Sequence, residues 1–329
     1  RPADPVCSSF LVAGLGALMH TGNKEIIEEA YEAFKAWENV LLERSDNYIV
    51  NYSHYGDWAS PQGSCVSDED AKSAVTPGIL MSTGYSYYNC KLLAEFAKLL
   101  GKEVDEKYYL QTADNIKKAF LDKWFDEKTG KVATGSQACQ AFPLWLGIIP
   151  KEYKKKAATV LCEDLLKNKY KVTTGNLCSR YIYDALTESG HIDEAWEIIT
   201  GEEYPSLGFM IQNVAATIWE RDELKINPGM DSHNHPMDGA VDYWFYAYLC
   251  GLKPTSPGWK TFTVKPYFPK KLLSAHARVE TPMGSIVVKW LKQYGKTQLY
   301  VTVPFGTAAT VEFGDNTYQL TCGFYNFSI

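Results

Sequence analysis

Apolar and polar positions follow two alternating patterns along the first two thirds of the chain. Residues 8–22 (SSFLVAGLGALMHTG) are apolar nearly all round, whereas residues 24–44 place Ile27, Tyr31 and Phe34 at helical spacing on one face. A helix that is apolar all round needs neighbours on every side, so this rhythm predicts pairs of inner and outer helices. The same alternation continues through residues 76–102, 106–124, 134–150, 153–168, 175–190 and 191–201.

Short turns containing Gly or Pro join the predicted helix pairs. This arrangement favours a mainly α fold, an α/α toroid lined by its apolar helices. The alternative is an α-solenoid. A solenoid carries a repeat of fixed period, but the chain has none, and its connecting loops differ greatly in length.

The pattern changes after Asp242. Residues 242–251 (DYWFYAYLCG) predict a last buried helix, and residues 252–259 (LKPTSPGW) have the Pro, Gly and Ser content of a linker. Beyond it, apolar and polar residues alternate in short runs that end at Gly or Pro. These runs predict a small antiparallel β-sandwich. The predicted domains are therefore an α/α toroid over residues 1–257 and a β-sandwich over residues 258–329.

Composition limits the classes of partner. The 329 residues carry a net charge of −6 without a Lys/Arg cluster, so neither nucleic acid nor an anionic membrane is an expected partner. Aromatic residues make up 14% of the chain. Surplus Tyr and Trp suit sugar-binding clefts, where ring faces stack on sugar C–H groups. A large helical core rich in Tyr explains the same numbers equally well.

The eight cysteines are scattered and form no Cys-x-x-Cys pair. They predict free thiols packed as small hydrophobic side chains, without a metal site, and they favour a reducing, cytoplasmic location. No apolar run approaches the length needed to span a membrane. No Gly-rich turn between a strand and a helix indicates a nucleotide, so we expect neither a metal nor an organic cofactor.

The candidate chemistry is concentrated in residues 208–221 (GFMIQNVAATIWER) and 230–245 (MDSHNHPMDGAVDYWF). The apolar run ends on Trp219, Glu220 and Arg221, and His233 and His235 follow Glu220 by thirteen and fifteen residues. This order predicts a polar pocket on a packed helix, where a carboxylate beside an aromatic ring acts on a polyhydroxylated substrate. The alternative is a helix end whose Glu and Arg face solvent.

Several stretches in this order resemble glycoside hydrolase family 78, the α-L-rhamnosidases. They are GDW at 56–58, TGSQACQAFPLWLGIIP, TTGNLCSRYIYDALTESGHIDEAWEII, EYPSLGFMIQNVAATIWERDE, MDSHNHPMDGAVDYWFYAYLCGLKP, GWKTFTVKP and VETPMGSIVVKW. The resemblance covers nearly the whole chain. It implies an (α/α)6 toroid followed by a β-sandwich, and hydrolysis of terminal α-L-rhamnose from glycosides or polysaccharides with inversion and without a cofactor.

The resemblance also implies roles for individual residues. Glu220 matches the Glu of the family's Trp-Glu pair and would be the general base. Arg221 would keep Glu220 ionised, and Trp219 would shape the pocket wall. An inverting enzyme needs its acid and base about 6.5–9.5 Å apart to admit water.

Four further residues match sugar-binding positions of the family. His235 matches its pocket histidine and would bond sugar hydroxyls, and His233 lies in the same stretch. Asp57 and Trp58 match the Gly-Asp-Trp loop, in which the ring packs against rhamnose and the acid binds a hydroxyl.

The chain also departs from the family pattern. It lacks the segment Asp-Cys-Pro-Gln-Arg-Asp-Glu that supplies the family's general acid, and about ten predicted helices replace the twelve of a full toroid. We therefore expect a fragment without its first helices, with the general acid outside this chain. Asp57 is disfavoured as the acid, because its loop shows neither burial nor a neighbouring carboxylate. In addition, Asp222 stands where relatives often have another Trp.

Three alternatives to the α-L-rhamnosidase interpretation stay open. They are a sugar-binding fragment without catalysis, another α/α-toroid glycosidase and a polysaccharide lyase. Missing helices would expose an apolar face, which predicts self-association as a homodimer.

Overall fold

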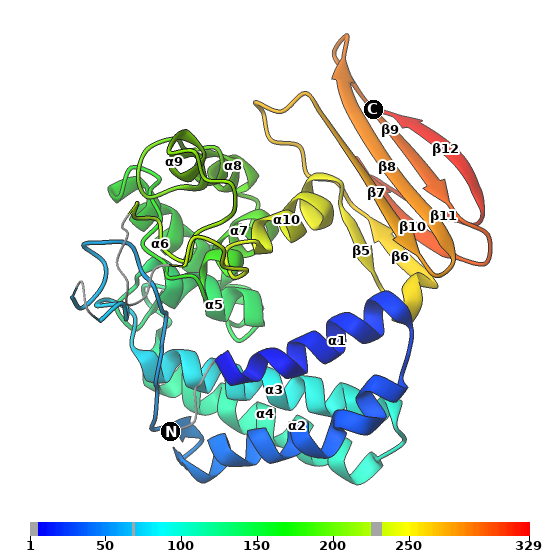
Figure 1. The fold of residues 1–329 in the computed structure, drawn as a ribbon. Helices are drawn as coiled ribbons and strands as arrows, with labels where there is room; N and C mark the ends of the chain where they lie inside the picture. Colours follow the sequence, from blue (N-terminus) through cyan, green and yellow to red (C-terminus); the bar gives the residue numbers. More distant parts are fainter. Residues whose placement is uncertain (1–5, 68–69, 225–231) are drawn as a thin grey trace. The chain divides into compact units, whose positions relative to one another are not determined.

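The computed structural model describes residues 6–67, 70–224 and 232–329, without the side chain of Cys7 (Figure 1). The chain divides into two compact units. The helical unit comprises residues 1–12 and 31–241, and the sandwich unit comprises residues 13–30 and 242–329.

The helices alternate as the sequence predicts. Their bounds are α1 Ser9–Thr21, α2 Glu25–Glu43, α3 Gly78–Leu99, α4 Glu103–Trp124, α5 Gln137–Leu146, α6 Lys154–Lys167, α7 Ser179–Glu188, α8 Ile192–Ile199, α9 Leu207–Gln212 and α10 Ala240–Trp244. Short 3-10 turns lie at Val6–Ser8, Lys151–Tyr153 and Pro257–Trp259, and a π-helical turn follows α10 at Phe245–Leu249. Two short hairpins, β1 Ser45–Asp46 with β2 Ile49–Val50 and β3 Phe125–Asp126 with β4 Lys131–Val132, join neighbouring helices.

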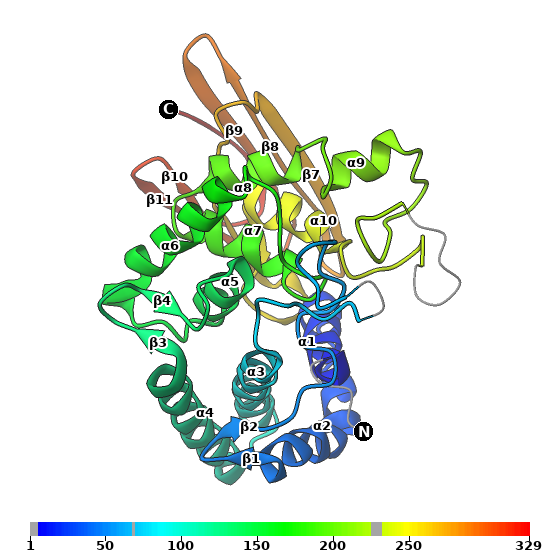
Figure 2. The same cartoon turned by 90° about the vertical axis from the view of Figure 1, so that its left-hand side faces the viewer.

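The inner and outer helices of the helical unit differ in burial. Most residues of α3, α5 and α7 are buried, and these helices contact one another in chain order. Helices α4, α6 and α8 each bury one face against the preceding inner helix, as Figure 2 shows. A Cβ atom on Gly84 of α3 would clash with the ring of Phe142 on α5. The inner helices therefore approach closely where the sequence provides a residue without a side chain.

The long helix predicted over residues 208–221 is wrong. Only Leu207–Gln212 is helical, and the C-cap residue Asn213 is followed by Val214 at a φ of 61°. Beyond it, the backbone of residues 218–220 bonds residues 232–235 instead of a preceding helical turn. The pairing with a distant segment thus overrides the local apolar pattern.

The sandwich unit contains two four-stranded sheets. One has the order β11-β10-β6-β5 and the other the order β12-β9-β8-β7. All strand pairs are antiparallel except β6 with β10, which run parallel. The strands are β5 Leu252–Pro254, β6 Thr261–Val264, β7 Ser274–Thr281, β8 Gly284–Gln293, β9 Lys296–Val303, β10 Ala308–Phe313, β11 Asn316–Leu320 and β12 Gly323–Ser328.

The core of the sandwich unit is built from the inward residues of both sheets. Trp290 and Phe313 are buried there, and the Trp290 Nε1–H donates to the carbonyl oxygen of Leu249 at 2.6 Å. Strand β5 lies in the segment predicted as a linker, so that prediction was wrong for Leu252–Pro254, which pair with β6. His20, interpreted as a cap or surface residue, accepts the Trp259 Nε1–H at 3.2 Å.

The described cysteines Cys65, Cys90, Cys139, Cys162, Cys178, Cys250 and Cys322 are free thiols, which confirms that prediction for these seven. Among the described helices, none combines the length and the apolar character that crossing a bilayer requires.

Candidate functional site

Asp57 joins the Gly-Asp-Trp loop to the start of α7. Its Oδ2 accepts the backbone N–H of Gly175 at 2.8 Å, and its Oδ1 accepts the backbone N–H of Cys178 at 3.2 Å. These N–H groups precede the first turn of α7, and the Cys178 N–H also donates to the carbonyl oxygen of Gly175 at 3.1 Å. Asp57 therefore caps the start of α7 from a loop that is distant in the sequence.

Burial sets the protonation of Asp57. The residue is fully buried, and this burial raises the pKa of its carboxyl group to about 7, although the two backbone N–H groups oppose the shift. The premise that its loop shows neither burial nor a neighbouring carboxylate was therefore wrong on both counts, because the charge of Asp238 adds to the shift. Both oxygens are occupied by the start of α7, so the geometry gives Asp57 a positioning role.

The loop packs tightly against the segment before α7. The backbone N–H of Asn176 donates to the carbonyl oxygen of Trp58 at 2.8 Å. A Cβ atom on Gly175 would clash with the carbonyl oxygens of Trp58 and Asp57. Only glycine permits this approach, which fixes the backbone of Trp58.

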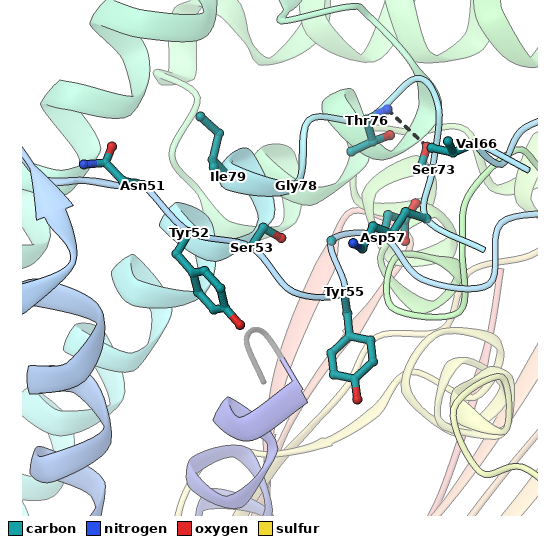
Figure 3. A pocket seen from close by; sticks show the side chains of 12 residues that line it. Asn51, Tyr52, Ser53, Tyr55, Asp57, Val66, Ser73, Thr76, Gly78 and Ile79 are labelled. Carbon is teal, nitrogen blue, oxygen red and sulfur yellow. Dashed lines mark hydrogen bonds between the residues drawn. The ribbon is translucent and has the colours of Figure 1, made fainter. Parts of the chain in front are cut away.

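Two hollows lie along this loop. The larger, about 440 Å³, is lined among others by Tyr52, Tyr55, Asp57, Lys72 and Thr76, and in Figure 3 the Tyr52 and Tyr55 side chains extend to the same side of the loop. The smaller hollow measures about 320 Å³ and is lined by His54, Tyr55, Trp58, Asp70 and Lys72.

Aromatic rings form one wall of the smaller hollow. The Tyr55 ring meets Trp58 edge-on with 5.3 Å between centroids, and His54 meets Tyr55 edge-on at 4.5 Å. Ring faces held in this way provide flat apolar surfaces beside hydroxyl and imidazole groups. This surface suits a sugar.

Glu220 lies where residues 218–220 bond to residues 232–235 through their backbones, an arrangement that we call the segment pair. Its backbone N–H donates to the carbonyl oxygen of Ser232 at 2.8 Å, and the Ser232 N–H donates to Glu220 Oε2 at 3.2 Å. The N–H of His235 donates to the carbonyl oxygen of Ile218 at 2.9 Å. Among the described residues, no donor bonds Glu220 Oε1.

The segment pair also brings Trp219 against His233. Their rings are stacked, with centroids 4.9 Å apart and planes 24° apart, and Trp219 is buried. The Nε2 atom of His233 is buried, and no described residue bonds it. The structure therefore gathers Trp219, Glu220, His233 and His235 in one place, as the sequence predicts from their spacing.

Arg221 is not exposed on a helix end, contrary to one of the two sequence interpretations. It is 4% exposed, and its Nε pairs with Glu223 Oε2 at 3.0 Å. Glu223 Oε1 also accepts the Tyr204 hydroxyl at 2.6 Å and the Gln62 N–H at 2.5 Å. Sequence reasoning missed Glu223, although it follows Arg221 by only two residues.

Two further carboxyl groups near α7 escaped the sequence interpretation. Asp222 and Asp238 line a small cavity with Ser179 and Tyr183. Burial is the main cause that raises the pKa of Asp222 to about 8 and that of Asp238 to about 7, and the charge of Asp238 adds to the shift of Asp222. The sequence signal that could have indicated these carboxyl groups was Asp222, which stands where relatives often have Trp.

The predicted site residues thus form two groups. Trp58 and Asp57 belong to the loop, whereas Trp219, Glu220, His233 and His235 belong to the segment pair. The bonds of Glu223 to Gln62 and Tyr204 join the two stretches of chain. Across the described ranges no hydrogen bond or ring contact joins Trp58 to Glu220, and no cluster of His, Cys, Asp and Glu has metal-binding geometry.

Comparison with known families identifies both parts of the chain. A model described as the bacterial alpha-L-rhamnosidase 6 hairpin glycosidase domain matches residues 11–249. A second, described as the bacterial alpha-L-rhamnosidase C-terminal domain, matches residues 251–323. These matches confirm the resemblance and the predicted fold class.

Individual proteins agree with the family models. The chain is 32% identical over 299 residues to an alpha-L-rhamnosidase of Alteromonas sp. (strain LOR), covering 88% of this chain and 32% of that protein. An alpha-L-rhamnosidase of Formosa agariphila is 29% identical over 315 residues, covering 94% of this chain and 34% of that protein. The chain therefore spans about a third of the length of these curated relatives.

A solved structure shows the same fold. The alpha-L-rhamnosidase from Dictyoglumus thermophilum superposes with a TM-score of 0.92 at 32% identity, covering 100% of this chain and 40% of that chain.

Proposed function

Because the chain belongs to the bacterial α-L-rhamnosidase family, we propose that it forms part of an active site that hydrolyses terminal α-L-rhamnose from rhamnose-containing glycosides. The observation that carries the proposal is the segment pair, which holds the Glu220 carboxylate on the backbone of Ser232. One oxygen is thereby fixed, and the other is left for chemistry.

Glu220 is the proposed general base of an inverting reaction. Its Oε1 takes a proton from a water molecule, the water oxygen bonds to C1 of the rhamnose, and the bond from C1 to the leaving oxygen breaks. A carboxylic acid gives a proton to the leaving oxygen. One step thus breaks the bond and inverts the configuration at C1.

The proton donor is proposed to lie outside residues 1–329. Asp57, Asp222 and Asp238 have the raised pKa values that a general acid requires. However, both carboxylate oxygens of Asp57 accept hydrogen bonds from backbone N–H groups, and Asp222 and Asp238 line a cavity of only about 20 Å³. Asp57 therefore has no carboxylate oxygen left for a glycosidic oxygen, and Asp222 and Asp238 have no room for one.

The remaining predicted residues bind the sugar. The Trp58 ring packs on rhamnose, while His233 and His235 bond its hydroxyl groups. Arg221 acts on Glu223 instead of directly on Glu220, so it supports the backbone next to the base. Trp219 holds the His233 ring through their stacking.

A rhamnoside with a good leaving group tests the role of the general base without requiring the general acid. The 2,4-dinitrophenolate ion leaves without a proton, so the 329-residue chain should slowly hydrolyse dinitrophenyl α-L-rhamnoside and leave methyl α-L-rhamnoside intact. Proton NMR should detect the β anomer of rhamnose first. Glu220→Gln should abolish this turnover but keep L-rhamnose binding, whereas Glu163→Gln, an exposed change on α6, should alter neither.

Each readout tests a different part of the proposal. Unchanged turnover in Glu220→Gln would refute the role of Glu220, and α-rhamnose as the first product would refute inversion. Equal hydrolysis of the methyl glycoside would place the acid within these 329 residues. Rhamnose binding without any turnover would instead support the alternative of a sugar-binding fragment.

A further inference from the structure

Glu223 lies where three separate stretches of the helical unit meet. Its Oε1 accepts the backbone N–H of Gln62 at 2.5 Å and the Tyr204 hydroxyl at 2.6 Å, and its Oε2 accepts the Nε–H of Arg221 at 3.0 Å. Because Glu223 is only 6% exposed, water hardly competes for these charge-assisted hydrogen bonds. One carboxylate therefore holds together the Gly-Asp-Trp loop, the segment before α9 and the stretch that follows Glu220.

Tyr204 strengthens this junction from a fixed ring. The ring meets Phe209 of α9 edge-on, with 5.6 Å between centroids, and the Gln62 N–H also donates to the Tyr204 hydroxyl at 2.7 Å. Burial and, after it, the hydrogen bond to Glu223 raise the pKa of the Tyr204 phenol. The hydroxyl therefore stays protonated near neutral pH and donates to the carboxylate.

Both sides of the junction lie next to residues of the candidate site. Gln62 follows Trp58 by four residues, and Arg221 directly follows Glu220. The guanidinium group of Arg221 also reaches the loop, since its Nη2 donates to Cys65 Sγ at 3.9 Å. The junction therefore ties the backbone that carries the proposed ring face to the backbone that carries the proposed base.

We propose that Glu223 is a positioning residue that sets the place of the Glu220 carboxylate relative to the ring face of Trp58. The inference rests on the proposed function, in which the ring binds rhamnose and the carboxylate activates a water molecule. A general base must lie within hydrogen-bond reach of the proton that it takes. A small displacement of its backbone therefore lowers turnover while leaving the sugar-binding surface in place.

Turnover and binding, measured together on the 329-residue chain, test this role. The turnover probe is dinitrophenyl α-L-rhamnoside, and calorimetry with L-rhamnose gives the affinity and the number of folded binding sites. Tyr204→Phe removes one donor but leaves the Gln62 N–H and Arg221 on the carboxylate. Its kcat per binding site should fall about fivefold, and the Kd for L-rhamnose should change less than twofold. Glu223→Gln should show the same split with a kcat loss of about thirtyfold.

A second pair of variants separates positioning from stability. Arg221→Met combined with Glu223→Gln leaves no buried charge, so it should recover part of the stability lost in Glu223→Gln. It should not recover kcat, because the junction to Gln62 and Tyr204 stays altered. Tyr108→Phe, a half-exposed tyrosine on α4, is the matched control for Tyr204→Phe and should leave kcat and Kd unchanged.

The outcomes distinguish this inference from the proposed function. An unchanged kcat per binding site in Tyr204→Phe and Glu223→Gln overturns the positioning role and leaves the function intact. Recovery of kcat together with stability in the double variant also overturns it, since Glu223 then acts only through folding. Absence of both turnover and L-rhamnose binding in the unaltered chain overturns the inference and the proposed function together.

Discussion

The Asp57 carboxylate lies 2.8 Å from the backbone nitrogen of Gly175, so a loop side chain closes the start of a helix 118 positions later in the sequence. This contact fixes the Gly-Asp-Trp loop against the start of α7 within the helical unit. The adjacent Trp58 inherits its position from the same contact. Asp57, which matches a sugar-binding position in the sequence, thus belongs to the framework that holds the neighbouring Trp58.

Asp57→Asn should destabilise the helical unit by about 1–3 kcal/mol, because the amide NH₂ would face a buried backbone N–H instead of accepting it. Urea unfolding followed by circular dichroism measures the change. Asp114→Asn, an exposed change on α4, is the control and should leave the midpoint unaltered. Equal midpoints for both variants would show that the cap contributes nothing.

The helix pairs were predictable because their signals are local. In α3 and α5, burial is nearly continuous and the residues are mostly apolar or small, and in α4 and α6 one buried face leaves a period of 3.6 residues. The segment from Asn213 to Arg221 broke the rule, since it forms turns and bends in which Val214 and Ala216 are exposed and Trp219 is buried. An apolar run alone does not distinguish the two conformations.

The site was only partly predictable for a different reason. Resemblance supplied Glu220, His233 and Trp58 by position, and the structure places Glu220 and His233 on one pair of segments and Trp58 on the Gly-Asp-Trp loop. The partners Glu223 and Gly175 depend on contacts between distant segments, which spacing does not encode. Burial of Asp57 follows from the same long-range contacts, which is why the expectation drawn from its loop was the opposite.

Glu223→Gln should be strongly destabilising, by about 3–5 kcal/mol, because it removes the ion-pair partner of the buried Arg221. Urea unfolding should show a much smaller loss for Asp122→Asn, which breaks the exposed pair with Lys118 and should cost less than about 1 kcal/mol.

A double-mutant cycle separates the ion pair from other contacts of Glu223. Arg221→Met combined with Glu223→Gln should recover part of the loss, since no buried charge then remains at position 221. Strict additivity of the two single changes would argue against the pair as the cause.

Glu38 predicts a pH dependence of stability that is independent of the site. It is fully buried between α2 and α3, where its carboxyl group bonds Ser86 Oγ at 2.5 Å, Asn89 Nδ2 at 2.9 Å and Cys90 Sγ at 3.5 Å. Burial raises the pKa of Glu38 to about 8, against these hydrogen bonds, and it also raises the pKa of the Cys90 thiol. The folded state therefore favours the neutral acid.

The sign of the effect follows from proton binding. The folded chain retains a proton on Glu38 that the unfolded chain releases near pH 4.5, so its contribution to stability is complete below that pH and is lost as the pH rises toward 8. The free energy of unfolding should fall by up to about 1.4 kcal/mol per pH unit in this window. Unfolding curves between pH 5 and 8 should show a shallower fall in Glu38→Gln, while Glu43→Gln, at the exposed end of α2, should follow the unaltered chain. Parallel curves for all three would exclude Glu38 as the source.

Trp58→Ala should weaken L-rhamnose binding by about tenfold, because the sugar loses a ring face worth roughly 0.5–1.5 kcal/mol beyond the apolar area it covers. Trp58→Phe keeps a ring at the same backbone position, which Asn176 and Gly175 fix, and should lose less than threefold in affinity.

Trp124→Phe on α4, a partly buried tryptophan that contacts Phe120, is the control for a tryptophan change remote from the loop and should leave affinity unchanged. Calorimetry with the free sugar measures all three affinities without depending on the general acid. If Trp58→Ala binds as tightly as the unaltered chain, rhamnose does not lie against this ring, and the aromatic wall of the smaller hollow serves only to pack the loop.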